Sequence, residues 1–132
     1  MLILFRHNAK KYAYDTASGA LIPLTALAKR MLEAVEPPLG AVCPTALRYE
    51  LAKYDSADVE EAYAELYDKA ANGVIFAPEK GILVTPDTDA DTAREALLAA
   101  AEALKAPVSV TGAHTALAQE ILRAKGLMKD PI

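Results

Sequence analysis

Few side chains in this chain are of the types that carry out acid–base or nucleophilic chemistry. The two histidines are His7, at the end of an expected strand, and His114, in an expected strand-to-helix turn. A helix start can hold an anion, but the sequence around His114 lacks the glycine-rich loop of a phosphate site. The single cysteine, Cys43, precedes Pro44 in an expected loop, and we interpret it as inert. These residues predict no catalytic centre.

Alternating aspartates make the one pattern that resembles a metal site. Asp87, Asp89 and Asp91 are spaced as in a calcium-binding loop. The glycine at the sixth position and the distal glutamate that complete such a loop are missing. The same aspartates suit helix capping and the positive end of a helix dipole. The sequence therefore predicts no metal or other cofactor, and a protein that is not an enzyme.

Two tyrosines favour binding of a partner molecule instead. Tyr63 and Tyr67 lie one turn apart on an expected helix over residues 56–72, and such a pair could offer flat apolar contact with a polar tip. Glu60 and Lys69 on the same helix could select the charge of a bound peptide. The alternative is that both tyrosines belong to the core.

The start of the chain is predicted to form a small sheet of three strands. Turn-forming residues separate three apolar runs. The runs cover residues 1–7, 11–15 and 20–24. A small sheet of this kind has an edge with unpaired backbone groups, which can accept another strand. The sequence therefore predicts a site for an extended peptide at residues 20–24.

Three helices are expected to follow the sheet. Apolar residues at helical spacing, capping residues and helix stops mark their bounds. The helices are predicted over residues 25–36, 44–53 and 56–72. Residues 74–76 are predicted to return as a short strand, the wing that follows the helical triplet in a winged helix-turn-helix. The fold class expected for residues 1–77 is therefore α+β, a winged helix-turn-helix with a three-stranded amino-terminal sheet.

A second part of the chain, residues 78–132, is predicted to form a βαβα extension of unknown role. The pattern indicates strand 82–85, helix 89–105, strand 108–110 and helix 113–125. A helix of this length suits the crossover between two parallel strands. Two strands bury little alone. This unit must therefore pack on the first part of the chain or on a second copy in a homodimer.

Composition and charge exclude several classes of protein. Of 132 residues, 53% are hydrophobic and 24% charged, which is ordinary for a globular domain. One cysteine excludes a disulfide scaffold, and no apolar run reaches membrane-spanning length or resembles a signal peptide, so we expect a cytoplasmic protein. Residues 1–53 hold seven basic and four acidic residues, a net charge of +3, whereas residues 54–132 hold seven and fourteen, a net charge of −7. The acidic second half argues against nucleic acid as the partner.

Residues 1–77 resemble the RiPP recognition element, a PqqD-like winged helix-turn-helix domain. Such domains bind the leader peptides of ribosomally made, modified peptides. The similarity is greatest to the amino-terminal domain of radical SAM maturases that make thioether crosslinks in cysteine-rich peptides. The matching segments are Ile3-Leu4-Phe5, Tyr14-Asp15 with Ser18-Gly19, Leu24 to Leu32, Val59 to Leu66, and Gly73-Val74-Ile75-Phe76.

The resemblance implies non-catalytic binding of a leader peptide, which adds as a strand beside residues 20–24 and lies in a groove against the expected helix over residues 56–72. The peptide-binding residues that it implies are Ala20, Leu21, Ile22, Leu24, Glu60, Tyr63 and Tyr67. Main-chain hydrogen bonds would supply affinity and side-chain pockets specificity. Pro23 lies inside this edge and removes one backbone donor.

The chain departs from the maturases after residue 77. They continue into a radical SAM barrel with a three-cysteine iron–sulfur motif, and Cys43 alone cannot hold such a cluster. The predicted βαβα extension does not match that barrel. The resemblance therefore implies a recognition module, free-standing, excised or diverged, that presents a precursor to a modifying enzyme such as a radical SAM enzyme.

Two other functions stay open. A winged-helix regulator would insert its third helix into the DNA major groove, but the helix predicted here carries five acidic residues and one lysine before Asn72. An accessory subunit would instead dock on a partner enzyme through residues 78–132. Its alanine-rich helix, over residues 92–106, has few large side chains and could pack closely against a partner helix.

Overall fold

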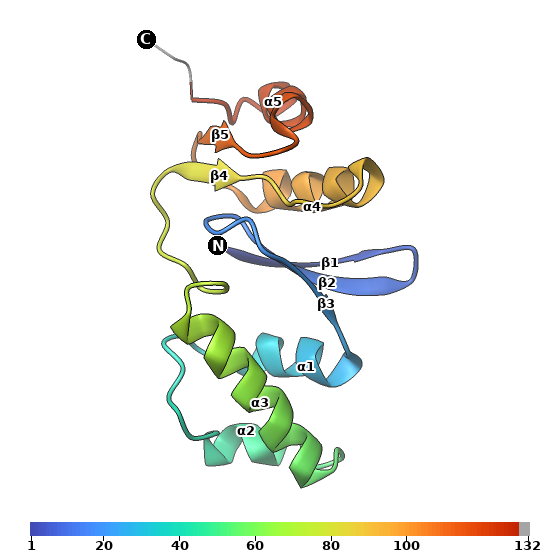
Figure 1. Ribbon diagram of the computed structural model, residues 1–132, viewed down its shortest axis with the longest axis vertical. Coiled ribbons are helices and arrows are strands. Elements are labelled where there is room, and N and C mark those ends of the chain that lie inside the picture. Colours follow the sequence, from blue (N-terminus) through green and yellow to red (C-terminus); the bar gives the residue numbers. More distant parts are fainter. Residues whose placement is uncertain (130–132) are drawn as a thin grey trace.

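A three-stranded antiparallel sheet lies in the middle of the protein (Figure 1). The computed structural model describes residues 1–129, and the strands pair in the order β1-β2-β3. They are β1 (Leu2–His7), β2 (Lys10–Asp15) and β3 (Leu21–Leu24). Asn8 and Ala9 have positive φ angles of 51° and 64°, so they form a two-residue turn whose twist suits the hairpin of β1 and β2. The three predicted strands are confirmed.

Three helices follow β3 on one face of the sheet, and α1 is the one packed directly against the strands. They are α1 (Ala26–Ala34), α2 (Thr45–Glu50) and α3 (Ser56–Ala71). Thr25 caps α1 and Asp55 caps α3, each by accepting a hydrogen bond from a backbone N–H of the first turn. Apolar side chains of the helices form one core with Ala13 of β2; the buried ones are Met31, Leu32, Leu47, Val59, Tyr63 and Leu66. The predicted succession of helices is confirmed, although α1 and α2 end earlier than expected.

The predicted strand at residues 74–76 is wrong. These residues form bends after the end of α3. The Val74 N–H donates to the Lys69 carbonyl at 2.9 Å, so the chain turns back on the helix, and Phe76 has a φ of 54°, which no extended strand allows. Ile75 is 1% exposed and buries its side chain in the core on the helical side. Burial of this isoleucine, rather than pairing with another strand, holds the segment in place.

The chain continues as the predicted βαβα unit. Its elements are β4 (Ile82–Val84), α4 (Ala90–Ala103), β5 (Ser109–Thr111) and α5 (Thr115–Ala124). β4 and β5 pair in parallel, with Leu83 opposite Val110, and α4 makes the crossover between them. The predicted parallel pairing is confirmed.

The βαβα unit packs on the other face of the sheet. Ile3 and Tyr14 turn away from the three helices and enter a second core, whose buried members from the βαβα unit are Leu83, Ala96, Leu97, Ala100, Ala101, Val108, Ala118, Ile121 and Leu122. Tyr14 is fully buried, and its hydroxyl donates to the Val84 carbonyl at 2.5 Å. Residues on both sides of the predicted boundary at residue 77 therefore belong to one core. The sequence allowed this unit to pack on the first part of the chain or on a second copy, and in the structure it packs on the first part.

The turn between β2 and β3 joins the sheet, the helices and the βαβα unit. The Asp15 carboxylate is fully buried and accepts hydrogen bonds from the backbone N–H groups of Ala17, Ser18 and Ala77 at 2.9, 3.0 and 3.2 Å. The Val84 N–H donates to a carbonyl of the same turn at 2.8 Å. These bonds hold the start of β3 against two other segments of the chain.

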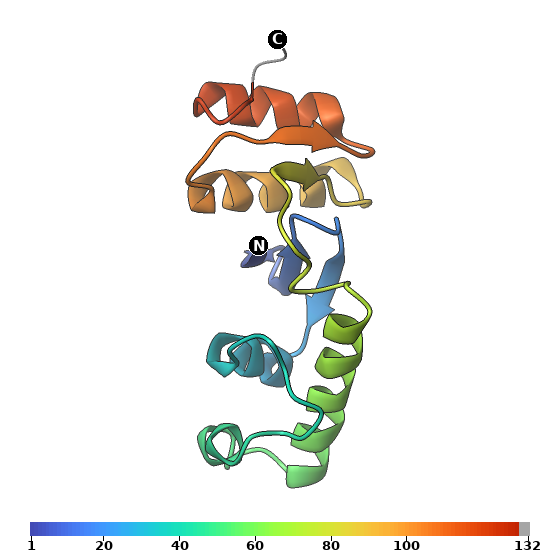
Figure 2. The same cartoon turned by 90° about the vertical axis from the view of Figure 1, so that its left-hand side faces the viewer.

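The elements are stacked along the long axis of the molecule (Figures 1 and 2). α2 and the start of α3 lie at one end, followed by α1, the sheet, α4, the pair of parallel strands and finally α5. The sheet is therefore covered on both faces, and its edges are the parts left to approach. None of the helices in residues 1–129 combines the length and the apolar character needed to cross a membrane.

Candidate functional site

The outer side of β3 is an open sheet edge. β3 is the last strand of the sheet within residues 1–129. The Asp15 N–H donates to the Ala20 carbonyl at 2.9 Å, and backbone groups of an antiparallel strand point alternately to its two sides. Ile22, opposite Ala13 in the register, therefore bonds β2. Leu21 and Pro23 direct their backbone groups outward, so the edge offers one N–H and two carbonyls.

Pro23 lacks a backbone N–H at a position where that group would point away from β2. Pro23 pairs with Tyr12 at a position where its nitrogen faces away from β2. Proline is tolerated on edge strands for this reason, and it also lowers the capacity of an edge for indiscriminate pairing. The sequence prediction that Pro23 removes one bond to a guest strand is consistent with this register.

Side chains of β3 are largely occupied by the two cores. Leu21 is half-buried against the core shared with the βαβα unit, whereas Ile22 and Leu24 are half-buried against the core of the helical side. Ala20 is also half-buried, at the start of the strand. The backbone of this segment, more than its side chains, is therefore what β3 offers to a ligand.

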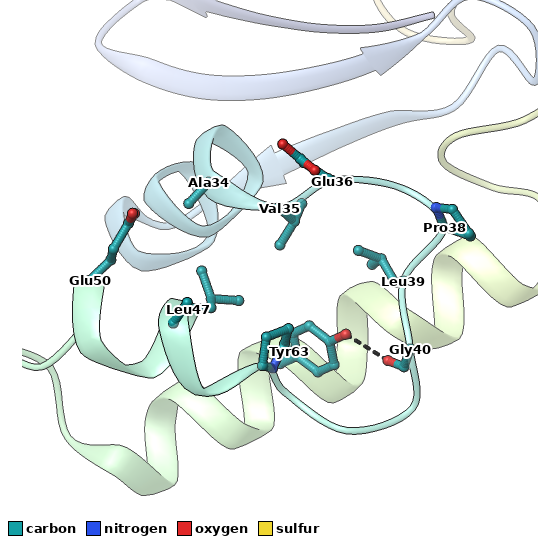
Figure 3. A pocket seen from close by; sticks show the side chains of 11 residues that line it. Ala34, Val35, Glu36, Pro38, Leu39, Gly40, Leu47, Glu50 and Tyr63 are labelled. Atoms are coloured by element: carbon teal, nitrogen blue, oxygen red, sulfur yellow. Dashed lines mark hydrogen bonds between the residues drawn. The ribbon is translucent and has the colours of Figure 1, made fainter.

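Tyr63, predicted to contact a peptide, is a core residue. It is 2% exposed, and its hydroxyl donates to the Gly40 carbonyl at 2.6 Å (Figure 3). Burial raises the pKa of Tyr63, and the nearby Cys43 and Tyr67 raise it further. Contrary to the prediction, this ring is not at the surface, because its polar tip finds a carbonyl partner within the helical layer. Figure 3 shows Tyr63 among the residues that line a hollow between α1, α2 and α3. The volume of this hollow is about 250 Å³.

Glu60 and Tyr67 lie on the same flank of α3 as Tyr63. The Glu60 carboxylate forms an ion pair with Arg48 of α2. Tyr67 is half-buried and lines an apolar hollow of about 480 Å³ beside the loop between α1 and α2. The other lining residues are Pro37, Pro38, Leu39, Ala70, Ala71 and Phe76. The structure brings these three predicted residues together, but against α2 and the loop.

The opposite flank of α3 lies toward β3. At about 100° per residue, Asp58, Ala62, Glu65 and Lys69 form a stripe on the side of the helix away from Tyr67. Figure 1 shows α2 and the loop on one side of α3 and β3 on the other, and Figure 2 shows α3 and β3 along the same side of the molecule. This stripe is therefore the flank of α3 on the side of β3. Of its members, only Lys69 was predicted from the sequence to contact a peptide.

The missed residues had a signal in the sequence. Asp58, Ala62, Glu65 and Lys69 are spaced four, three and four residues apart, which places them on one face of a helix. Tyr63 and Tyr67, four residues apart, lie on another face. The tyrosines drew attention because large aromatic rings often make binding surfaces. In this chain the same rings serve the core, and a small residue, Ala62, lies in the middle of the flank that faces β3.

Two of the polar residues singled out in the βαβα unit, His114 and Asp89, have structural partners. The His114 ring nitrogen Nε2 lies 2.7 Å from the Thr88 carbonyl, and the His114 backbone N–H donates to Thr85 Oγ1 at 3.2 Å. Asp89 caps α4, and its hydrogen bonds with the Thr92 N–H and hydroxyl lower the pKa of its carboxyl. Within residues 1–129, no three His, Cys, Asp or Glu side chains gather closely enough to hold a metal ion.

The small face of α4 is used inside the chain. Ala93, Ala96, Ala100 and Ala101 are all buried, at 3% exposure or less, between the sheet and the rest of the βαβα unit. A partner helix therefore cannot pack on this face in the folded chain. The docking surface that the alanine-rich sequence suggested is covered by β1 and α5.

No protein-family model, curated protein or solved structure matches this chain, and it is assigned to no family on those grounds.

Proposed function

We propose that this protein binds an extended peptide by strand addition to the outer edge of β3 and catalyses no reaction. The observation that supports this most strongly is the register of β3, which leaves the backbone N–H of Leu21 and the carbonyls of Leu21 and Pro23 directed outward. An edge of this kind, above a helix flank, is the arrangement that peptide-binding sheets use.

The expected affinity is modest. Three outward groups allow at most three backbone hydrogen bonds, each contributing about 0.5–1.5 kcal/mol net. Alternate side chains of the guest would point toward the α3 flank and toward the βαβα unit. Contacts with the Asp58–Lys69 stripe would then supply selectivity. The backbone bonds alone would support about millimolar affinity, so binding in the micromolar range needs the side-chain contacts as well.

The guest class follows from the resemblance of residues 1–77 to the RiPP recognition element. On that basis the guest is the leader segment of a ribosomally made precursor, and the protein presents it to a separate modifying enzyme, such as a radical SAM enzyme. DNA is disfavoured as the guest because α3 carries five acidic residues and one lysine, which would face phosphates of like charge.

Fluorescence anisotropy tests the proposal with labelled short peptides encoded beside this gene, and with a DNA duplex as the control. Leu21→Pro removes the outward N–H and should lower peptide affinity about threefold to tenfold, the equivalent of one hydrogen bond. Leu21→Val keeps the N–H and serves as the matched control. Pro23→Val restores the missing donor at an exposed position and should raise affinity by a similar factor.

A different result would place the peptide-binding site at the hollow beside Tyr67. If Tyr67→Ala abolishes peptide binding while Leu21→Pro and Pro23→Val leave it unchanged, the guest occupies the apolar hollow on the far flank of α3, and strand addition is wrong. Saturable binding to the duplex with none to the peptides would contradict peptide recognition altogether.

A further inference from the structure

The α3 flank beside β3 has an ordered distribution of charge. Asp58 and Glu65 are exposed acids in the first two-thirds of the helix, and Lys69 is a half-buried cation in its last turn. Between the two acids the flank carries Ala62, whose small side chain leaves room above the helix. A guest strand at the edge of β3 would lie over this stripe and would meet acids toward one end and a cation at the other.

The cationic end of the stripe lies by the turn that begins β3. The Ser18 hydroxyl donates to the Val74 carbonyl at 2.7 Å, which ties the end of α3 to that turn. The Val74 N–H in turn bonds the Lys69 carbonyl. The start of α3 instead lies beside α2, at the other end of the helix (Figures 1 and 2). The acids therefore lie toward the end of α3 that is farther from the β2–β3 turn.

A second cation lies beside the same turn. Lys80 is exposed and lines a hollow of about 380 Å³ together with Ser18, Gly73 and Ile82. This hollow is formed by the β2–β3 turn, the segment after α3 and the first strand of the βαβα unit. Two lysines therefore lie by the turn that begins β3, whereas the two carboxylates of the stripe lie farther from this turn along α3.

We infer that the guest peptide carries an acidic side chain beside Lys69 at the turn end of β3 and basic side chains over Glu65 and Asp58. This inference rests on the proposed strand addition and adds the charge order of the guest. Opposite charges placed this way attract, and the reversed order repels at every position. The interaction is between exposed or half-exposed groups, so it acts as selectivity and weakens with salt.

The spacing of the guest charges follows from helix and strand geometry. Lys69 and Glu65 are about 6 Å apart along the helix axis, and Lys69 and Asp58 about 16 Å, at 1.5 Å per residue. A strand rises about 3.4 Å per residue, and side chains on one face recur at every second residue. On the same face of the guest, the position nearest Glu65 is therefore the second from the acidic residue, at about 6.8 Å, and the position nearest Asp58 is the fourth, at about 13.6 Å.

The test is a selection from a random octapeptide display library, made with the full chain and with the double variant Glu65→Lys/Lys69→Glu, which leaves the net charge unchanged. We expect the original chain to enrich peptides that carry one acidic residue and basic residues at alternate positions on one side of it. The basic residues follow or precede the acidic one, according to the direction in which the peptide binds. The double variant should enrich the inverted charges at the positions facing 65 and 69. Asp68→Lys, on the outward face of α3, is the control that should leave the order unchanged.

Affinities of the selected peptides, measured by anisotropy, sharpen the result. A peptide selected on the original chain should bind the double variant about fivefold more weakly at low salt, and this difference should shrink in 0.5 M sodium chloride. Circular dichroism of each variant verifies that the helices persist.

The outcomes separate this inference from the function on which it rests. If peptides are enriched and depend on the Leu21 N–H but show no charge order, or the same order on the double variant, the charge inference is overturned and strand addition stands. If no peptide is enriched, strand addition fails and the charge inference falls with it.

Discussion

The two faces of the central sheet are covered in different ways. The face toward α1 and α3 packs against large side chains, such as Met31 and Leu66, from helices that follow the sheet directly in the chain. The other face packs against α4, a helix whose buried residues are mostly alanines. This helix begins at Ala90, far from the sheet in the sequence. Small side chains allow α4 to approach the strands closely.

This difference shows why the edge of β3 is the candidate site. With both faces covered, the sheet has no apolar face to offer, and the outward backbone groups of Leu21 and Pro23 are what it presents at β3. It also shows that the βαβα unit is part of the structural core. The following three predictions test whether the two faces belong to one cooperative unit, in order of decreasing effect.

The largest effect is expected from cavities on either face. Leu97→Ala on the α4 side and Met31→Ala on the α1 side each remove a side chain that is 1% exposed or less. Each should lower the free energy of unfolding by about 2–5 kcal/mol. Urea unfolding followed by circular dichroism measures both changes, and the fluorescence of the six tyrosines together gives a second probe.

If the two faces form one unit, both variants should shift a single transition that the two probes report together. A separate early transition in Leu97→Ala alone, with the helical side intact, would contradict this view and would make the βαβα unit an independently unfolding part.

A smaller effect is expected at the turn that meets the βαβα unit. A Cβ added at Gly19 would lie 2.5 Å from Val84 Cγ1 and 3.2 Å from the Thr85 carbonyl, at a φ of +80°. Gly19→Ala should therefore cost about 2–4 kcal/mol, from left-handed strain and overpacking together. Gly73→Ala, at a φ of +71° with no atom within 4 Å, isolates the strain and should cost about 1 kcal/mol.

Thermal unfolding of the two glycine variants measures this difference. Equal destabilisation by Gly19→Ala and Gly73→Ala would mean that the turn and β4 do not approach closely in solution. It would contradict the contact between Gly19 and Val84.

The smallest effect, and the one that depends on pH, is expected from the hydroxyl of Tyr14. Tyr14→Phe removes the bond to the Val84 carbonyl and should cost about 1–2 kcal/mol at neutral pH. Burial raises the pKa of Tyr14 above its usual value, and the Asp15 charge raises it further. Its contribution is therefore complete below about pH 10 and is lost as the pH rises toward the folded-state pKa.

Urea midpoints at pH 7 and at pH 11 test this prediction. The original chain should lose stability between these values, and Tyr14→Phe should lose less. Tyr12→Phe, whose ring stacks on Phe5 at a centroid distance of 5.3 Å, is the control and should change the neutral midpoint little. An equal alkaline loss in the original chain and in Tyr14→Phe would contradict the assignment.

Much of the fold was predictable because it depends on local patterns. Alternating and helical spacing of apolar residues predicted the three strands, the helices and the parallel pairing of β4 and β5. Caps such as Thr25 and Asp89 were readable from residue type. The strand expected at residues 74–76 failed because Ile75 is buried by distant residues, a fact that the short apolar run Val74-Ile75-Phe76 does not contain.

The candidate site was only partly predictable. The edge at residues 20–24 followed from the order of the strands, and Pro23 was recognised as a missing donor. The flank of α3 that carries Tyr63 and Tyr67 was predicted from their ring chemistry, and the structure places this flank against α2 and the loop between α1 and α2. Gly40 accepts the hydroxyl of Tyr63, and it lies 23 residues away in the chain.

The sequence by itself determined most of the elements, their order and the charge along α3, because these depend on residue type and on spacing within one turn or one strand. Only the tertiary structure decided which flank of α3 lies toward β3, that α4 covers the second face of the sheet, and that Tyr14 joins the two halves through Val84. The physical reason is that packing depends on contacts between residues far apart in the chain, and periodicity within a segment says which face is apolar but not what will cover it.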